Sequence, residues 1–245
     1  MNTQSTIEKM KQLKLFGMSE LYHRSLSEHL FRDYTTDEFL AMLVDTEWDQ
    51  RHNRKISNMT KMAGFRIATQ STNVDYSTNR NLDKNMFERL LSLHFVRQAE
   101  NLIITGPSGV GKSYLAQAIG QTAVQNLIKT IYYNAGKLQE EIKLSKIQGT
   151  YMKLLKKIQA ASLLIIDDFG LLPMDNHSRQ AFFDIVEDRH ERAATILTSQ
   201  IPVKGWYEII GEGTIADAIL DRVVFSSHRI DLSGESLRKN KKLNG

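Results

Sequence analysis

The residues best suited to chemistry form one glycine-rich segment, Gly106-Pro107-Ser108-Gly109-Val110-Gly111-Lys112-Ser113. The segment matches the phosphate-loop pattern G-x-x-x-x-G-K-[ST], and it lies between an apolar run at 101–105 and a helical pattern at 114–119. Glycines let backbone N–H groups surround a phosphate, and the start of the helix adds partial positive charge. We therefore expect this loop to bind ATP, with Lys112 reaching the β- and γ-phosphates and Ser113 binding Mg²⁺.

Two carboxylates follow the most apolar stretch of the chain. Residues 163–166 read Leu-Leu-Ile-Ile, which is typical of a buried central strand, and Asp167 and Asp168 come directly after them. Ligands of open parallel sheets bind at the carboxyl ends of the strands, so both side chains are expected near the phosphates. Asp167 would complete the Mg²⁺ shell, and Asp168 would polarise the attacking water. A third apolar run at 194–198 ends in Ser199-Gln200, and in ATPases of this layout Gln200 would lie between Asp168 and the γ-phosphate.

Other kinds of site are excluded or disfavoured. The chain contains no cysteine, which excludes disulfide scaffolds, cysteine-ligated zinc and thiol catalysis. A nucleophile elbow G-x-S-x-G would need glycine where Val110 stands. A dinucleotide site at 211–216 is disfavoured because Glu212 would oppose a pyrophosphate. A metabolic phosphate-loop kinase stays open as an alternative, but it would need an acceptor site and lid arginines that we do not find.

Three regions must position these residues. Residues 1–67 are predicted to form a helical N-terminal domain, because apolar residues recur at helical spacing over 7–30 and a capping-box sequence at 35–38 starts a second helix. That helix continues into a basic stretch at 51–66, with no acid between Asp49 and Asp75. Residues 68–85 are polar and aperiodic, which predicts a linker. From residue 86 to 245 helical and apolar segments alternate, as in an α/β domain with a parallel sheet.

The location of the protein is predicted from what the sequence lacks. No apolar signal-peptide core can be drawn at the N-terminus, and the longest strongly apolar run is far shorter than the roughly 20 residues that span a bilayer. We therefore expect a cytoplasmic protein without a membrane partner. Its net charge of +4 permits an anionic partner without proving one.

Taken together, these motifs resemble those of the AAA+ ATPases, and more narrowly the IstB-like helper ATPases of insertion sequences, which are related to the DnaC helicase loader and to DnaA. The resemblance covers nearly the whole chain and rests on the segments at 14–18, 101–120, 163–170 and 195–239. It implies an AAA+ core with a parallel sheet behind a small all-helical N-terminal domain, and a reduced or absent C-terminal lid.

The resemblance also assigns roles to particular residues. Arg222 resembles an arginine finger that reaches the ATP of a neighbouring subunit, Arg238 the second sensor arginine, and Gln200 the first sensor. An inserted arginine would stabilise charge that develops on the phosphate oxygens, while a plain salt bridge between Arg222 and Asp221 is the competing interpretation. Asp168 stands where many AAA+ enzymes have glutamate, which suggests slow, switch-like ATP hydrolysis.

The implied function is that of a DNA-binding helper of transposition. The protein would assemble on duplex DNA as a homo-oligomer with ATP at its subunit interfaces, and would recruit or regulate the transposase of the same element. A DnaC-type replicative helicase loader is the alternative. The resemblance implies that the basic region before the apolar run at 163–166 lines a DNA channel and contacts the DNA backbone. Four lysines of this region recur at the spacing of one helical face that is broken by Gly149, namely Lys143, Lys146, Lys153 and Lys157. A helix face that is only solvated is the competing interpretation.

Overall fold

The computed structural model describes residues 3–28, 33–76, 80–211, 213–225 and 227–237. The chain divides into two compact units, Met1–Asn58 and Met59–Gly245. The sequence pattern placed this division near residue 67, whereas in the structure it falls inside a continuous helix. In the described part of the chain, no helix is both long and apolar enough to cross a membrane.

The N-terminal unit consists of helices α1 (Thr3–Gln12), α2 (Phe16–Glu28) and the first part of α3 (Thr36–Ala63). The periodic stretch at 7–30 forms two helices rather than one, because the backbone turns at Lys14 with φ 59°. The predicted capping box is present: the Thr35 N–H donates to Glu38 Oε2 over 2.7 Å, and the Glu38 N–H donates to Thr35 Oγ1 over 3.3 Å.

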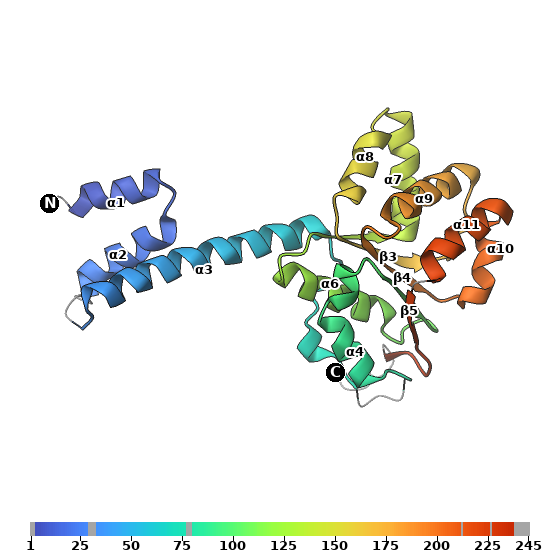
Figure 1. Ribbon diagram of the computed structural model, residues 1–245, viewed down its shortest axis with the longest axis horizontal. Coiled ribbons are helices and arrows are strands. Elements are labelled where there is room, and N and C mark those ends of the chain that lie inside the picture. Colours follow the sequence, from blue (N-terminus) through green and yellow to red (C-terminus); the bar gives the residue numbers. More distant parts are fainter. Residues whose placement is uncertain (1–2, 29–32, 77–79, 212, 226, 238–245) are drawn as a thin grey trace. The chain divides into compact units, whose positions relative to one another are not determined.

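The second unit contains one parallel sheet of five strands in the order β2-β3-β4-β1-β5. Figure 1 labels β3, β4 and β5 of this sheet. Three strands follow the predicted apolar runs, namely β1 (Asn101–Thr105), β3 (Leu163–Phe169) and β4 (Ala194–Ser199). The two outer strands, β2 (Thr130–Asn134) and β5 (Ser227–Asp231), were not among those predicted. The order places β1 and β4 next to each other at the centre, so the loop after β1 opens beside the ends of β3 and β4.

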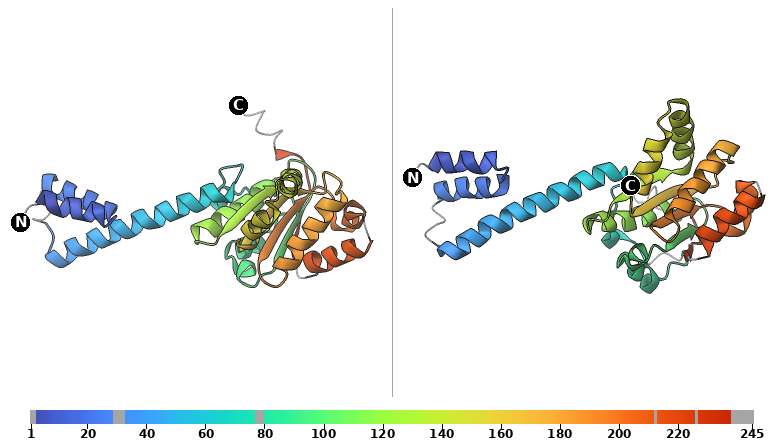
Figure 2. Two further views of the ribbon diagram at one scale, coloured as in Figure 1. Left: turned by 90° about the horizontal axis from the view of Figure 1, so that it is seen from above. Right: turned by 45° about the horizontal axis from the view of Figure 1, so that its top comes forward.

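Helices cover both faces of this sheet (Figure 2). Side chains alternate along β1: Leu102 and Ile104 belong to one core cluster and Ile103 to the other. The first face carries α4 (Lys84–Leu91), α5 (His94–Arg97) and α6 (Lys112–Gln125). The second carries α7 (Ala135–Ile147), α8 (Tyr151–Gln159), α9 (Asn176–Arg189), α10 (Trp206–Ile210) and α11 (Gly213–Val224), with the 3-10 helix η3 (Val203–Gly205) before α10. The α/β architecture expected from the sequence is confirmed.

The predicted linker at 68–85 belongs to the second unit and packs against α6 where it is described. It contains a 3-10 helix, η2 (Ser71–Asn73), which contacts α6, and it buries Val74 and Arg80. The polar composition of this segment did not indicate such packing. Arg80 packs through hydrogen bonds to two backbone carbonyl oxygens, which an apolar pattern does not reveal.

Candidate nucleotide-binding site

The glycine-rich segment forms a tight loop between β1 and α6, and its glycines are required by geometry. Gly109 has φ 84° and Gly111 φ 100°, the left-handed region that favours glycine. A Cβ at Gly111 would lie 2.5 Å from Arg80 Nη1, and a Cβ at Gly109 would collide with the Ser236 side chain. The loop is therefore closely surrounded on its outer side as well as by the helix that follows it.

The two polar residues that end the loop bind protein atoms in this structure. Lys112 is 5% exposed, and its Nζ donates to the carbonyl oxygens of Gly106 and Pro107, each over 2.8 Å. Ser113 Oγ donates to Asp167 Oδ1 over 2.8 Å. Both side chains thus lie at the start of α6, and a helix N-terminus is a favourable place for a phosphate.

Asp167 is the most buried carboxylate of the site, with only 2% exposure. It accepts hydrogen bonds from three hydroxyls: Ser113, Thr198 at its Oδ1, and Tyr132, whose Oη lies 2.7 Å from Oδ2. Burial, followed by the hydrogen bond to Asp167, raises the pKa of the Tyr132 phenol, and Arg66 acts in the opposite direction. A buried carboxylate is stable when its oxygens are satisfied, which these donors achieve.

A bulge in β3 changes the direction of the Asp168 side chain. The register of β3 against β4 shifts between Ile166 and Phe169, and Asp168 has a left-handed backbone with φ 61°. Its N–H donates to Thr198 Oγ1 over 3.1 Å, and Asn134 Nδ2 donates to its Oδ2 over 3.0 Å. Bulges commonly redirect side chains beside active sites, and here the bulge lets two consecutive carboxylates serve one site.

These groups line one cavity of about 820 Å³. Its walls include the phosphate loop, both aspartates and Gln200, together with residues from the segment 66–80. The volume is in the range of pockets that hold a nucleotide-sized ligand, about 300–1,000 Å³. The residues that carry the sequence prediction and lie here together are Ser108, Gly109, Gly111, Lys112, Ser113, Asp167, Asp168 and Gln200.

The donor set fits Mg²⁺. Ser113 Oγ and Asp167 Oδ1 lie 2.8 Å apart at the phosphate loop, so one ion could be held by both. The described residues contain no cluster of three or more acids, histidines or cysteines that could form an all-protein cage. Mg²⁺ commonly uses one or two protein oxygens and completes its shell with phosphate oxygens and water, which is the arrangement this cavity allows.

Comparison with known proteins agrees with this geometry. The sequence model of the family described as IstB-like ATP binding protein matches residues 8–245. The chain belongs to the IstB-like ATP-binding family. Insertion sequence ATP-binding protein y4pL of Sinorhizobium fredii is 39% identical over 97% of this chain and 97% of its own length. The IS21 ATP-binding protein of Pseudomonas aeruginosa is 30% identical over 95% and 88% of the two chains.

Solved structures show the same AAA+ fold for this IstB-like chain. The DnaC helicase loader superposes with a TM-score of 0.57 at 18% identity and covers 67% of this chain and 96% of its own. AMPPCP-bound DnaA from Aquifex aeolicus gives a TM-score of 0.58 at 19% identity, with 74% and 57% covered. At these identities the likeness establishes the fold and leaves the residues' roles to be tested.

Two predicted arginines of this IstB-like chain lie away from the cavity or outside the described residues. Arg222 on α11 forms an ion pair with Glu187 on α9, not with Asp221, and its guanidinium lies 5.5 Å from the centre of the Phe183 ring. It is not among the residues that line the cavity of its own chain. Arg238 lies outside the described residues.

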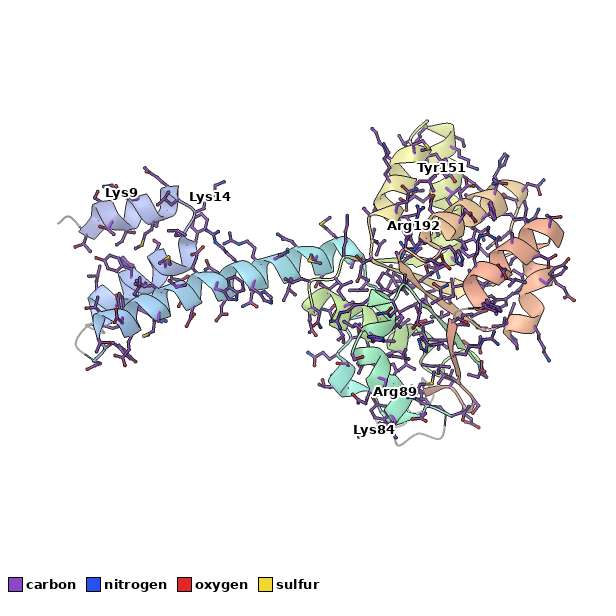
Figure 3. The ribbon with its side chains drawn as sticks, viewed as in Figure 1. Lys9, Lys14, Lys84, Arg89, Tyr151 and Arg192 are labelled. Carbon is purple, nitrogen blue, oxygen red and sulfur yellow. The ribbon has the colours of Figure 1, made fainter. Side chains whose placement is uncertain are left out.

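The four predicted lysines occur on two helices rather than on one broken face. Gly149, with φ 68°, separates α7, which carries Lys143 and Lys146, from α8, which carries Lys153 and Lys157. Lys143 Nζ lies 2.8 Å from Asp175 Oδ2. Lys146 Nζ lies 4.9 Å from the ring centre of Tyr151, which Figure 3 labels. Lys157 Nζ donates to Tyr133 Oη over 2.9 Å, and Lys153 is exposed.

Sequence analysis missed several residues that the fold brings to the site. Tyr132 and Asn134 lie on β2, which was not predicted although its isoleucine and tyrosines favour a strand. Thr198 is the last residue of the predicted third run, and its position one strand away from Asp167 was the available signal. Arg66 and Arg80 belong to stretches read as helix end and linker, and nothing local marked them as cavity residues.

Proposed function

We propose that this chain is an ATP-dependent, DNA-binding helper of transposition that assembles on duplex DNA with ATP and recruits or regulates the transposase of its own element. The observation that carries the proposal is the convergence of Lys112, Ser113, Asp167 and Asp168 on one cavity. It occurs in a chain whose relatives bear the name of insertion sequence ATP-binding proteins over nearly their full length.

The cavity supports a division of labour for ATP hydrolysis. Lys112 would leave the loop carbonyls to bind the β- and γ-phosphates, and Ser113 and Asp167 would hold Mg²⁺, which neutralises developing phosphate charge. Asp168 would polarise the attacking water, and Gln200 would contact the γ-phosphate. The amide of Asn134 occupies one oxygen of Asp168 in this structure, which supports slow, switch-like turnover because the base must first exchange that hydrogen bond.

Arg222 is the candidate that would link hydrolysis to assembly. Its ion pair with Glu187 joins side chains that are 24% and 49% exposed. The guanidinium would exchange this pair, its hydrogen bond to the Ala218 carbonyl oxygen and its contact with the Phe183 ring for the ATP of a neighbouring subunit. Such a contribution would make the site complete only in a homo-oligomer, with Arg238 as the proposed second sensor.

Assembly is tested by measuring duplex DNA binding and particle mass with ATP, ADP or no nucleotide, at fixed Mg²⁺. We expect ATP to promote both, and Arg222→Ala to reduce ATP-dependent assembly and ATP hydrolysis at least about tenfold, since arginine fingers contribute factors of about 10³–10⁵. Arg192→Ala is the control for loss of an arginine from the same unit, because Arg192 is exposed.

The outcomes separate the alternatives. Assembly that ignores the nucleotide, or an Arg222→Ala variant that assembles and hydrolyses like the wild type, would contradict the mechanism. A preference for single-stranded DNA and a stable complex with a replicative helicase would instead support a DnaC-type loader. Co-purification with the transposase of the same element would support the transposition role.

A further inference from the structure

The basic stretch at 51–66 ends in a residue that the proposed function has not used. Helix α3 stops at Ala63, and Gly64 follows with φ 73°, a common way to end a helix. The chain then turns toward the sheet, so that Arg66 and Ile67 line the nucleotide cavity. Arg66 thus differs from the other basic residues of the stretch, none of which lines that cavity.

The backbone of Arg66 is fixed to the helix that begins with Lys112. Gln117 on α6 is fully buried, and its Oε1 accepts hydrogen bonds from the N–H groups of Arg66, over 2.8 Å, and Ile67, over 3.1 Å. Its Nε2 donates to the carbonyl oxygen of Ser113 over 3.1 Å. One buried amide therefore joins the Arg66 backbone to the metal-binding end of the phosphate loop.

A second anchor lies next to the first. A Cβ at Gly120 would come within 2.8 Å of Phe65 Cε1, so the phenyl ring packs directly on the α6 backbone. Phe65 and Gln117 together hold the chain on both sides of the Arg66 Cα. Fixing the backbone in this way limits the volume that the exposed guanidinium can explore, as a binding group requires.

Arg66 lines the cavity together with residues of its phosphate end, among them Lys112 and Ser113. Arg66 and Tyr132 line the same cavity, and the charge of Arg66 opposes the rise in the pKa of the Tyr132 phenol that burial and Asp167 produce. Tyr132 Oη in turn donates to Asp167 Oδ2 over 2.7 Å. Arg66 is therefore one side chain removed from the carboxylate that is expected to hold Mg²⁺.

The charges of the cavity explain why a cation is useful there. The described lining residues include three cations, Arg66, Arg80 and Lys112, against Asp75, Asp167 and Asp168. The Nη groups of Arg80 donate to the carbonyl oxygens of Val110 and Asp75, so that guanidinium serves the loop itself. Mg·ATP is anionic, and without Arg66 its phosphates would face three carboxylates with Lys112 as the principal mobile cation.

We propose that Arg66 binds the terminal phosphate of ATP from within the same chain. This inference rests on the proposed ATP-binding function and adds a contact that distinguishes ATP from ADP. The Arg66 side chain, which lines the cavity, binds the phosphate oxygens, and the anchored backbone keeps it within reach. The residue after α3 thereby senses whether the third phosphate is present.

The test compares equilibrium binding of ATP and ADP to the full-length chain at fixed Mg²⁺, for the wild type and three variants. Arg66→Gln removes the charge, and Arg66→Lys keeps the charge but loses the planar fork. Lys61→Gln removes a charge from the last turn of α3 and is the matched control. We expect Arg66→Gln to weaken ATP binding about tenfold or more and ADP binding less than about threefold, as for loss of a charge-assisted hydrogen bond.

Each outcome decides the proposal. Intermediate ATP binding by Arg66→Lys, with Lys61→Gln like the wild type, supports a direct phosphate contact. Equal losses for ATP and ADP, no loss, or an equal effect of Lys61→Gln would overturn it. A circular dichroism melt of each variant excludes misfolding as the cause. If the wild type itself bound neither nucleotide, the proposed function would fail, whereas normal binding by Arg66→Gln removes only this inference.

Discussion

Asp167 shows how single side chains prepare this site for a metal. Its carboxylate is buried but receives hydroxyl hydrogen bonds from Ser113, Thr198 and Tyr132, which come from three different elements. A buried carboxylate without donors would be costly, so these contacts offset the burial of Asp167. Ser113 is expected to transfer to the metal, which leaves Tyr132 and Thr198 to orient the carboxylate.

We predict that Tyr132→Phe raises the Mg²⁺ concentration needed for half-maximal ATP hydrolysis. The variant keeps the ring but loses the donor to Asp167 Oδ2, and removal of such supporting hydrogen bonds typically costs about 10–100-fold in metal affinity. An Mg²⁺ titration of the hydrolysis rate at saturating ATP provides the measurement. Tyr133→Phe is the control, because Tyr133 belongs to the core cluster of the opposite face. A similar shift in both variants would count against an orienting role.

At the scale of elements, the three strands after which chemistry was expected, β1, β3 and β4, were identified because apolar runs and their polar ends are visible in the sequence. Residues 163–166 and 194–198 are such runs, and β3 and β4 follow them closely. The edge strand β5 was missed because its residues read Ser-His-Arg-Ile-Asp and only Ile230 is buried. The positions of Arg66 and Arg80 could not be predicted, because they depend on the path of a polar segment across α6.

The N-terminal unit contains a buried carboxylate, Glu47, that the sequence pattern did not predict. Glu47 on α3 is 7% exposed and accepts hydrogen bonds from the N–H groups of Gly17, over 2.7 Å, and Met18, over 3.3 Å. Burial alone would raise the pKa of Glu47, but the Arg51 side chain and these two N–H donors outweigh it and leave the pKa lowered. Gly17 permits the contact, since a Cβ there would lie 2.8 Å from the Thr46 carbonyl oxygen.

We predict that acid weakens the pairing of α2 with α3. Because the folded-state pKa of Glu47 is below its ordinary value of 4.5, its stabilisation is present above that pH and is lost as pH falls through the folded-state pKa. Glu47→Gln should lower protection of α2 by about 1.5–3 kcal/mol at pH 7 and flatten its acid dependence. Hydrogen exchange of peptides from α2, corrected for intrinsic rates, provides the measurement. Asp49→Asn, an exposed change on the same helix, should leave α2 as it is, and an equal effect of both variants would refute the assignment.

At the scale of the whole molecule, folding changes how the positive charge can be used. The net charge is +4, and the region before β3 contains the four lysines that were expected to contact DNA. Lys143 and Lys157 lie near Asp175 and Glu141, at 2.8 and 4.0 Å, so part of that charge is balanced within the protein. Lys153 on α8 is exposed, and within the described residues it forms no ion pair. It is therefore the lysine of this group best placed to contact a DNA backbone.

We predict that Lys153→Ala weakens duplex DNA binding for every sequence tested and lowers the salt dependence. Each phosphate contact contributes about 0.9 to the slope of log K against log salt, so the slope should fall by about that amount. Lys143→Ala should change the slope less, because removing this lysine also leaves Asp175 without its partner.

Lys84→Ala is the control: Lys84, labelled in Figure 3, is exposed on α4, which covers the other face of the sheet from α8. Filter binding or fluorescence anisotropy between 50 and 200 mM salt, roughly the range over which such contacts are resolved, measures all three slopes. A fall for Lys84→Ala equal to that for Lys153→Ala would mean that DNA senses only the net charge of the protein, because a surface contact on α8 requires the two faces to differ.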